Sequence, residues 1–275
     1  MAGILWIASY PKSGNTWVRI FLANLILNEP EPVPFARIGS VCPGEAHEIW
    51  FRPFTDRPVS ELSRAEIAKL RCHVQMCAAR TMKHIIPLKT HNYLGEDCGH
   101  PLISMEATRA VIYILRDPRD VALSVADQFG VSVAETIEIM NKEGTTGLAT
   151  PGHSVHEVLS SWSTHVRSWT QMRHGKLHVV RYEDRLADPY GELGKIARKL
   201  GITTEEARIR RAVGHASFKT LQEMERETGF AERSEFSERF FRSGRSGAWK
   251  DELTPELAKR IERDHREQMK RFGYL

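Results

Sequence analysis

Residues 5–17, LWIASYPKSGNTW, run directly into VRIFLANLIL, and this segment constrains the fold more than any other. Residues 3–8 are predicted to form a buried strand. Residues 14–27 are predicted to form a helix, because apolar residues recur there with helical spacing. A loop between a strand and a helix N-terminus offers an anion backbone N–H groups and the positive end of the helix dipole. The segment therefore predicts a phosphate-binding turn.

The side chains of this loop also suit phosphate. Lys12 adds a full charge, Ser13, Asn15 and Thr16 add hydrogen-bond donors, and Gly14 lets the backbone approach an anion closely. The nucleoside-triphosphate signature GxxxxGK[ST] is absent, because the lysine precedes Ser13 and Gly14. A turn in which Ser13 or Asn15 only caps the helix remains an alternative at this point.

Further strands are predicted at residues 84–91, 111–115 and 177–182, and helical patterns alternate with them. The expected helices cover residues 60–72, 119–129, 155–172, 188–200, 205–213, 218–226 and 255–270. This alternation predicts an α/β fold with a mainly parallel central sheet flanked by helices. The length of 275 residues is within the range of a single domain. Residues 29–58 carry six of the thirteen prolines and predict an irregular excursion.

Composition narrows the functional class. The net charge of +4 is too small to predict a dedicated nucleic-acid-binding protein. The four cysteines form no CxxC pair, and neither a signal peptide nor a membrane span is evident in the sequence. We therefore expect reduced thiols, a cytoplasmic location and no integral membrane association.

A second anion site is predicted at VIYILRDPRDVALS. Strand 111–115 delivers Arg116 to a loop, and the following helix presents Ser124, so the two side chains could bind a phosphate together. The alternative is an ordinary turn and helix start, with Asp117 as the cap and Pro118 in the first turn.

Two more segments carry candidate chemistry. In FFRSGRSGAWK, Arg242, Arg245 and Lys250 alternate with glycines, which suits either phosphate binding or a solvated basic loop. In LKTHNY, Lys89 and His91 lie two residues apart at a strand end, so a cation and a titratable base share one face. His91 taken alone could equally be an ordinary, partly buried imidazole.

Together these segments resemble a known family, the soluble sulfotransferases that use 3′-phosphoadenosine-5′-phosphosulfate (PAPS). SYPKSGNTW is similar to the family's 5′-phosphosulfate loop and RDPRDVALS to its 3′-phosphate segment. RYEDRLADP resembles its tyrosine strand, and FRSGRSGAWK its C-terminal RxGxxGxWK signature. The resemblance implies one sulfotransferase domain over residues 1–275, with an architecture like that of the P-loop NTPases.

The resemblance also implies a reaction and its residues. An acceptor hydroxyl or amine would attack the sulfur of PAPS in line, releasing adenosine 3′,5′-bisphosphate (PAP), with no metal expected. His91 matches the catalytic base, and Lys12 and Lys89 match cations that stabilise the transferring group. The residues implied for binding PAPS, besides Lys12, are Ser13, Gly14, Asn15 and Thr16 at the 5′-phosphate, Arg116, Ser124, Arg242, Ser243 and Gly244 at the 3′-phosphate, and Trp17, Tyr182 and Phe218 at the adenine.

Two departures from the family pattern limit what is carried over. Ser243 replaces a common lysine, which weakens the expected 3′-phosphate site. The usual KxxxTVxxxE dimerisation segment has Pro255 and Lys259 at the valine and acidic positions, so the oligomeric state stays open.

The acceptor is also open, although a small molecule is favoured over a membrane-bound glycan. Trp50, Phe51, Phe54 and Phe129 could line an acceptor pocket or belong to the core. Residues 228–239 could form a lid or a charged surface loop. A kinase-like NTPase, a non-catalytic nucleotide-binding protein and a glycan sulfotransferase remain as rival functions.

Overall fold

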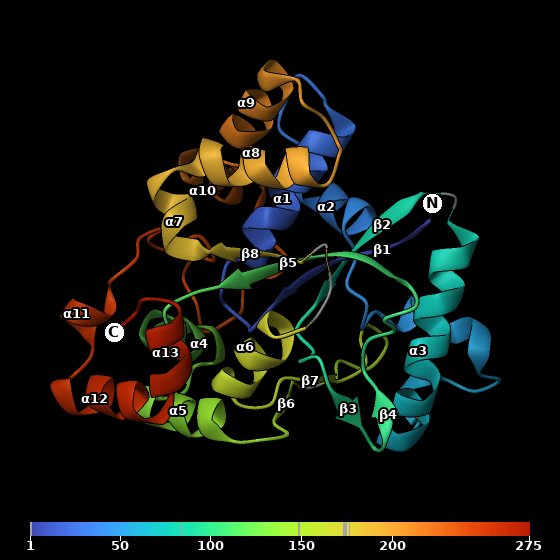
Figure 1. Ribbon diagram of the computed structural model, residues 1–275, viewed down its shortest axis with the longest axis horizontal. Helices are drawn as coiled ribbons and strands as arrows, with labels where there is room; N and C mark the ends of the chain where they lie inside the picture. Colours follow the sequence, from blue (N-terminus) through green and yellow to red (C-terminus); the bar gives the residue numbers. More distant parts are fainter. Residues whose placement is uncertain (1, 83, 148, 173–174, 176) are drawn as a thin grey trace. The chain divides into compact units, whose positions relative to one another are not determined.

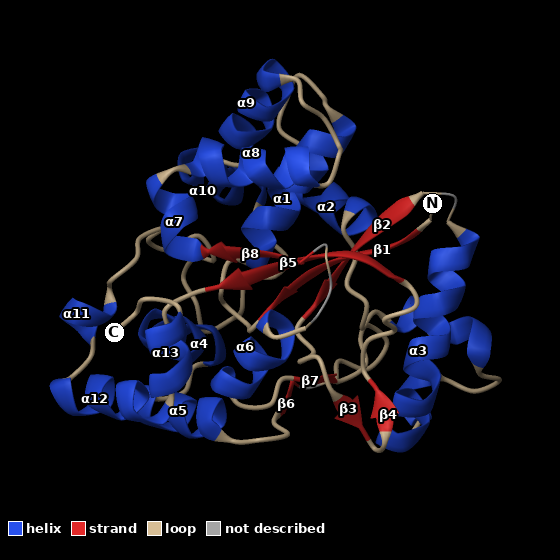
Figure 2. Cartoon of the chain, in the orientation of Figure 1, coloured by secondary structure: helices blue, strands red, loops and turns tan. Residues whose placement is uncertain are grey.

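The computed structural model describes residues 2–82, 84–147, 149–172, 175 and 177–275. Its main sheet has four strands in the order β2-β1-β5-β8 (Figures 1 and 2). These strands are β1 (Gly3–Ser9), β2 (Ile85–Thr90), β5 (Thr108–Leu115) and β8 (Leu177–Arg181). The predicted α/β fold, with a mainly parallel central sheet flanked by helices, is confirmed.

The pairing of β1 with β2 determines which residues meet at the end of the sheet. Every residue of β1 is buried, as expected for a strand covered on both faces. The two strands run parallel, in a register that begins with Gly3 opposite Ile85 and ends with Ala8 opposite Thr90. The residues that leave the carboxyl ends of both strands therefore lie at one edge, where ligands bind in sheets of this kind.

The other elements are short strand pairs and helices. β3 (Glu96–Asp97) pairs with β4 (His100–Pro101), and β6 (Thr146–Gly147) pairs with β7 (Glu157–Val158), both antiparallel. The α-helices are α1 (Asn15–Leu27), α2 (Phe35–Val41), α3 (Arg64–Thr81), α4 (Pro118–Phe129), α5 (Val133–Asn141), α6 (Trp162–Thr170), α7 (Tyr182–Ala187), α8 (Pro189–Lys199), α9 (Glu206–His215), α10 (Phe218–Thr228), α11 (Trp249–Glu252), α12 (Pro255–Asp264) and α13 (Arg266–Arg271). Short 3₁₀ turns are η1 (Glu48–Trp50), η2 (Arg52–Phe54) and η3 (Val59–Glu61).

The chain divides into two compact units, each built from three segments. The first contains Met1–Tyr10, Pro43–Tyr113 and Met140–Val179. The second contains Pro11–Cys42, Ile114–Ile139 and Val180–Leu275. That all of them form one domain stays a prediction.

The first unit has an apolar core beside α3. Its buried members are Ala46, Phe51, Val59, Ile67, Val74 and Val155. Trp50 and Phe54 pack against this cluster, and the Trp50 indole donates to the carbonyl oxygen of Gly44 at 2.9 Å. Three of the four aromatic residues considered for an acceptor pocket therefore belong to a core. The fourth, Phe129, lies in the second unit and is 56% exposed.

The second unit packs its helices around α1. Figure 1 shows α8 and α9 beside α1, and these helices are in contact with it. The Arg208 guanidinium of α9 donates to the carbonyl oxygen of Leu25 near the end of α1, at 2.7 and 2.9 Å. Most side chains of α1 are buried, so its N-terminus is held by packing over the whole length of the helix.

Three helices of the structure have bounds that differ clearly from those predicted from the sequence. The helix expected at 155–172 is wrong in its first half, because Glu157 and Val158 form β7 and the helix begins at Trp162. The helix expected at 60–72 begins at Arg64, where Ser63 and Glu66 form a reciprocal capping box, and continues to Thr81. The helix expected at 255–270 is broken into α12 and α13 at His265.

Candidate functional site

The turn between β1 and α1, residues 11–16, is the predicted phosphate loop and has an unusual backbone. Lys12 has a φ of 64° and Gly14 a φ of 100°, both in the left-handed region. Gly14 is the N-cap of α1, and no side chain caps this helix. A Cβ at Gly14 would lie 2.9 Å from the ring of Tyr182, so the close approach requires glycine. The alternative in which Ser13 or Asn15 serves only as a helix cap is therefore wrong.

Lys12 is held within this loop. Its Nζ donates to Oε1 of Gln128 at 2.8 Å and lies 4.3 Å from the ring centroid of Phe240. Burial lowers the pKa of Lys12 to about 8, and the positive charges of Arg116 and Arg242 act in the same direction. An anion bound at this loop would favour the charged ammonium, so ligand binding and protonation of Lys12 are coupled.

Arg116 reaches the same loop from the end of β5. Its guanidinium donates to the carbonyl oxygen of Lys12 at 3.0 Å and lies 4.4 Å from the ring centroid of Tyr182. Asp117 caps α4 by accepting from the N–H of Arg119 at 2.9 Å. Asp117 and Pro118 therefore start the helix as the alternative interpretation expected. That Arg116 binds a phosphate together with Ser124 stays a prediction. Ser124 lies half-buried in α4.

The three predicted adenine-binding rings come together in the second unit. The centroid of Trp17 lies 6.2 Å from that of Tyr182 and 6.3 Å from that of Phe218. Trp17 and Tyr182 are buried, and Phe218 is half-buried. The rings are steeply inclined to one another, so this is an aromatic cluster and not a parallel stack.

The C-terminal motif is anchored through its backbone. Asp120 accepts from the N–H groups of Gly247 and Trp249 at 2.7 and 3.0 Å. Gly244 has a φ of 58°, and a Cβ there would lie 2.5 Å from the Phe218 ring. Arg242 and Ser243 are exposed. The Arg242 guanidinium is 3.5 Å from the carboxylate of Glu252 and 4.0 Å from that of Asp127.

Buried donors at the loop fit an anionic nucleotide. Ser13 Oγ, Trp17 Nε1 and Arg116 Nε are all buried, and none has a hydrogen-bond partner within the described chain. Buried polar groups are normally paired, and leaving them unpaired costs about 1–3 kcal/mol each. A set of unpaired donors beside a glycine cradle is the arrangement that a bound phosphate would complete.

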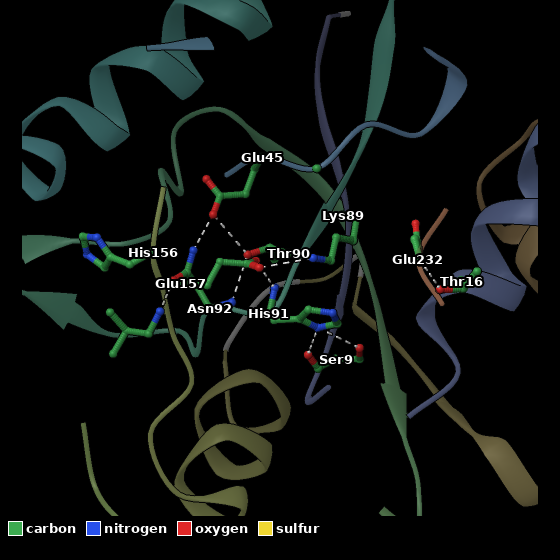
Figure 3. Close-up of polar contacts among 12 residues, drawn as sticks. Ser9, Thr16, Glu45, Lys89, Thr90, His91, Asn92, His156, Glu157 and Glu232 are labelled. Atoms are coloured by element: carbon green, nitrogen blue, oxygen red, sulfur yellow. Dashed lines mark hydrogen bonds and ion pairs between the residues drawn. The ribbon is translucent and has the colours of Figure 1, made fainter. Parts of the chain in front are cut away.

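The first unit contains Lys89 and His91 at the end of β2. His91 Nδ1 lies 2.8 Å from the carbonyl oxygen of Ser9, at the end of β1 (Figure 3). Because a carbonyl oxygen only accepts, Nδ1 carries the proton in the neutral imidazole. The lone pair is therefore on Nε2, which makes this nitrogen the basic one.

Glu157 on β7 holds both predicted catalytic residues of this unit. Its carboxylate accepts from Lys89 Nζ at 3.1 Å and from the backbone N–H of His91 at 2.6 Å (Figure 3). Burial alone would raise the pKa of Glu157, but the charges of Lys89 and His91 lower it to about 2. The carboxylate is thus a fixed negative charge between the two residues. The sequence prediction missed Glu157, because residues 155–172 were assigned to a helix.

His165 and Glu45 fix the backbone and side chains around this site. Burial lowers the pKa of His165 to about 3, so the ring is neutral. Its Nε2 lies 3.1 Å from the carbonyl oxygen of His91, and its Nδ1 lies 2.9 Å from the Tyr113 hydroxyl. Nε2 therefore donates to His91 and Nδ1 accepts from Tyr113. Glu45 forms a buried 2.6 Å ion pair with Arg71.

Comparison with known proteins decides the family of this chain. The family model described as "Sulfotransferase domain" matches residues 4–273. The chain belongs to the sulfotransferase domain family. The resemblance to sulfotransferases seen in the sequence is therefore confirmed.

Individual sulfotransferases are similar over nearly the whole chain. Sulfotransferase 2A2 of Rattus norvegicus is 27% identical, covering 98% of this chain and 85% of the rat protein. Cytosolic sulfotransferase 16 of Arabidopsis thaliana is 24% identical, covering 98% of this chain and 77% of the plant protein. The solved structure of mouse sulfotransferase SULT7A1 complexed with PAP is similar in fold, with a TM-score of 0.60 and 20% identity over 97% of this chain and 84% of the mouse chain.

The described part of this sulfotransferase contains neither a metal-binding cluster nor a membrane-spanning helix. Among the residues described, no group of three or more His, Cys, Asp or Glu side chains lies close enough to hold a metal ion. Within the same residues, no helix has both the length and the apolar character needed to cross a bilayer.

Proposed function

We propose that this sulfotransferase transfers a sulfonate group from PAPS to a hydroxyl or amine of a small-molecule acceptor and releases PAP. One observation carries the proposal: Ser13, Trp17 and Arg116 present buried donors without acceptors around a glycine cradle. The mouse structure named above was solved with PAP, which supports the same nucleotide here. A kinase-like activity is less favoured, because GxxxxGK[ST] is absent.

The nucleotide would be held mainly by residues of the second unit. Backbone N–H groups at the start of α1, together with Lys12, Ser13, Asn15 and Thr16, are proposed to bind the 5′-phosphosulfate. Arg116, Ser124, Arg242, Ser243 and Gly244 are proposed for the 3′-phosphate, and Trp17, Tyr182 and Phe218 for the adenine. Because Arg242 is already close to Asp127 and Glu252, binding of a 3′-phosphate would have to compete with these carboxylates.

The transfer step needs a base for the acceptor and cations for the leaving group. We assign the base to His91, whose Nε2 carries the lone pair because Nδ1 donates to Ser9. As the oxygen or nitrogen of the acceptor forms its bond to sulfur, its proton moves to Nε2 and the bond from sulfur to the phosphate oxygen breaks. Lys12 and Lys89 would stabilise the charge that develops on the sulfonate and on the departing phosphate.

The acceptor is proposed to be a small molecule, and the protein is proposed to act in the cytoplasm. Related plant proteins are named cytosolic sulfotransferases, which supports this location. A lid formed by residues 228–239 is supported by Glu232. Its carboxylate accepts from Thr16 Oγ1 at 2.8 Å and from Arg19 at 2.6 Å, so this segment reaches the phosphate loop within the second unit (Figure 3).

Isothermal titration calorimetry tests the nucleotide first. We expect PAP to bind much more tightly than AMP, which lacks the 3′-phosphate, and than ATP with magnesium. Arg116→Ala should lower the affinity for PAP by about tenfold to a hundredfold, because hydrogen bonds to charged groups contribute about 1.5–3 kcal/mol. Arg198→Ala is the control, because this arginine pairs with Glu206 on the exposed surface. If ATP with magnesium bound more tightly than PAP, the sulfotransferase proposal would be wrong and a kinase-like activity would be favoured.

A turnover assay tests the chemistry. PAPS with a phenol or a primary alcohol should yield the sulfated product and PAP in equal amounts, detected by mass spectrometry. Nucleotide binding without turnover of any acceptor in a broad screen would favour the non-catalytic alternative.

A further inference from the structure

Arg185 in α7 is a buried cation that the proposed site does not yet use. Its side chain is among the largest that are fully buried in the protein. All three guanidinium nitrogens are buried, and the part of the chain that the structure describes offers them no acceptor besides the Tyr182 side chain. Such a group is unusual, because buried charges in proteins are normally paired or bound to a ligand.

The surroundings of Arg185 belong to the phosphate loop and its aromatic cluster. The guanidinium carbon lies 3.4 Å from the ring centroid of Trp17 and 4.6 Å from that of Tyr182. A Cβ built at Gly14 would lie 3.5 Å from one of its terminal nitrogens. The guanidinium therefore lies beside the turn at Gly14 and over the ring proposed to stack on adenine.

The two acidic residues that precede Arg185 on α7 offset its charge only in part. The Glu183 carboxylate accepts from the Asp117 N–H at 3.0 Å and from the Tyr274 hydroxyl at 2.8 Å, and the Asp184 carboxylate pairs with Arg181 at 3.3 Å. The pKa of Arg185 is lowered to about 9 by burial, which Tyr182 and Glu183 oppose and the charge of Arg116 reinforces. Cation–π contact with Trp17 and Tyr182 offsets part of the desolvation but supplies no countercharge.

We propose that Arg185 is a positioning residue for the nucleotide: a buried positive charge beside the loop whose countercharge is the phosphate groups of the ligand. The inference rests on the proposed function and extends it to a residue outside the loop and its two phosphate motifs. The charge acts across Gly14 without touching the ligand, where poor screening makes it effective over several ångströms. The same side chain fixes the plane of Trp17. An anionic nucleotide therefore gains more from Arg185 than a neutral nucleoside does.

Calorimetry with PAP and with adenosine separates charge from packing. Arg185→Met keeps much of the side-chain volume and removes the charge, whereas Arg185→Lys keeps the charge and loses the planar group. Arg181→Met is the matched control, because Arg181 is close in sequence but pairs with Asp184 at 3.3 Å. Thermal unfolding of each ligand-free variant accompanies the titrations.

We expect Arg185→Met to lower the affinity for PAP about tenfold and that for adenosine less than about twofold. The reason is that the substitution removes one buried charge near the phosphates. Arg185→Lys should recover most of the PAP affinity, and Arg181→Met should bind as the wild type does. The ligand-free Arg185→Met protein should melt no lower than the wild type, because an unpaired buried charge is removed.

Three results would overturn the inference. The first is an equal loss of PAP and adenosine affinity in Arg185→Met, which would show only support of the Trp17 ring. The second is unchanged PAP affinity. The third is a marked fall in melting temperature in both Arg185→Met and Arg185→Gln, which would make the residue structural. Failure of the wild type itself to bind PAP would instead contradict the proposed function.

Discussion

The polar groups around His91 and those around the phosphate loop are paired to very different degrees. In the first unit, Lys89 and the backbone N–H of His91 both donate to Glu157. The His91 ring donates to the carbonyl oxygen of Ser9, and the carbonyl oxygen of His91 accepts from His165. In the second unit, several buried donors at the loop have no acceptor among the described residues. The groups around His91 named above are paired within the described chain, whereas a bound anion would pair the buried donors at the loop.

This difference predicts that the two regions contribute differently to the stability of the ligand-free protein and to ligand affinity. A network whose members are already paired stabilises the fold and holds its geometry before any substrate arrives. Unpaired buried donors reduce the stability of the ligand-free protein. A ligand that accepts hydrogen bonds from them removes this penalty, and the free energy gained strengthens binding. Substitutions around His91 should therefore affect turnover, and substitutions at the loop should affect binding.

The largest effect is expected for His91→Ala. Removing the base should lower kcat by about 10²–10⁴-fold. PAP affinity should stay within about twofold, because the nucleotide donors belong to the other unit. Steady-state kinetics and calorimetry on the same preparation check this, with His100→Ala on β4 as the control. If His91→Ala turned over normally, the assignment of the base would be wrong.

Glu157→Gln tests the paired region itself. Loss of a charged acceptor for Lys89 and His91 should lower kcat by about tenfold while PAP still binds. The folded-state pKa of about 2 lies below the ordinary value of 4.5, so the carboxylate stabilises the fold above about pH 4.5. This stabilisation is lost as the pH falls from about 4.5 towards 2.

Urea unfolding at several pH values measures the Glu157 contribution. The free energy of unfolding of the wild type should exceed that of Glu157→Gln at pH 7, and the difference should shrink at about pH 3. Glu96→Gln, at an exposed position on β3, should show no such trend. A difference independent of pH would contradict a buried, ionised Glu157.

PAP affinity should also depend on pH through Lys12. Its pKa of about 8 in the ligand-free protein should rise when an anion binds, so binding is tightest below about pH 8 and weakens above it. Calorimetry at pH 7, 8 and 9 should show up to about tenfold loss per pH unit above the pKa. In Lys12→Met this part of the pH dependence should disappear. An affinity unchanged up to pH 9 in the wild type would disprove the coupling.

The smallest effect is expected for Glu232→Gln. The Glu232 carboxylate accepts from Thr16 and Arg19 beside the loop, so it competes with a phosphate for these donors. Its side chain is 42% exposed, which limits the gain in PAP affinity to a few-fold. Stopped-flow binding should show a faster association rate, with Glu235→Gln as the control. Weaker PAP binding in Glu232→Gln would mean that the carboxylate supports the loop instead of competing for it.

Much of the fold was predictable, because the sequence patterns that mark strands, turns and helices agree with where these elements lie in the structure. The apolar run of β1, the glycine turn and the amphipathic start of α1 identify the first strand, loop and helix. The helix expected at 155–172 failed for a physical reason: Val155, Val158 and Leu159 have helical spacing, but Ser160 has a φ of 57°, which breaks a helix before Trp162.

The candidate site was only partly predictable. Lys12, Arg116 and Trp17 belong to motifs, so their proximity followed from the order of strands and loops. Glu157 belongs to no motif, and Arg185 lies within RYEDRLADP at a position to which the resemblance gives no function. The contacts of both residues are long-range, and periodicity does not report them. The sequence assigned RYEDRLADP only by its resemblance to a tyrosine strand, whereas the structure places Arg185 in α7 and buries it against Trp17.

The interleaving of the two units has a consequence for the history of the gene. The chain passes from one unit to the other after Tyr10, Cys42, Tyr113, Ile139 and Val179. Neither the region holding His91 nor the one holding the phosphate loop is encoded by a continuous stretch. Exchange of any one continuous segment of the gene would therefore replace only part of either unit.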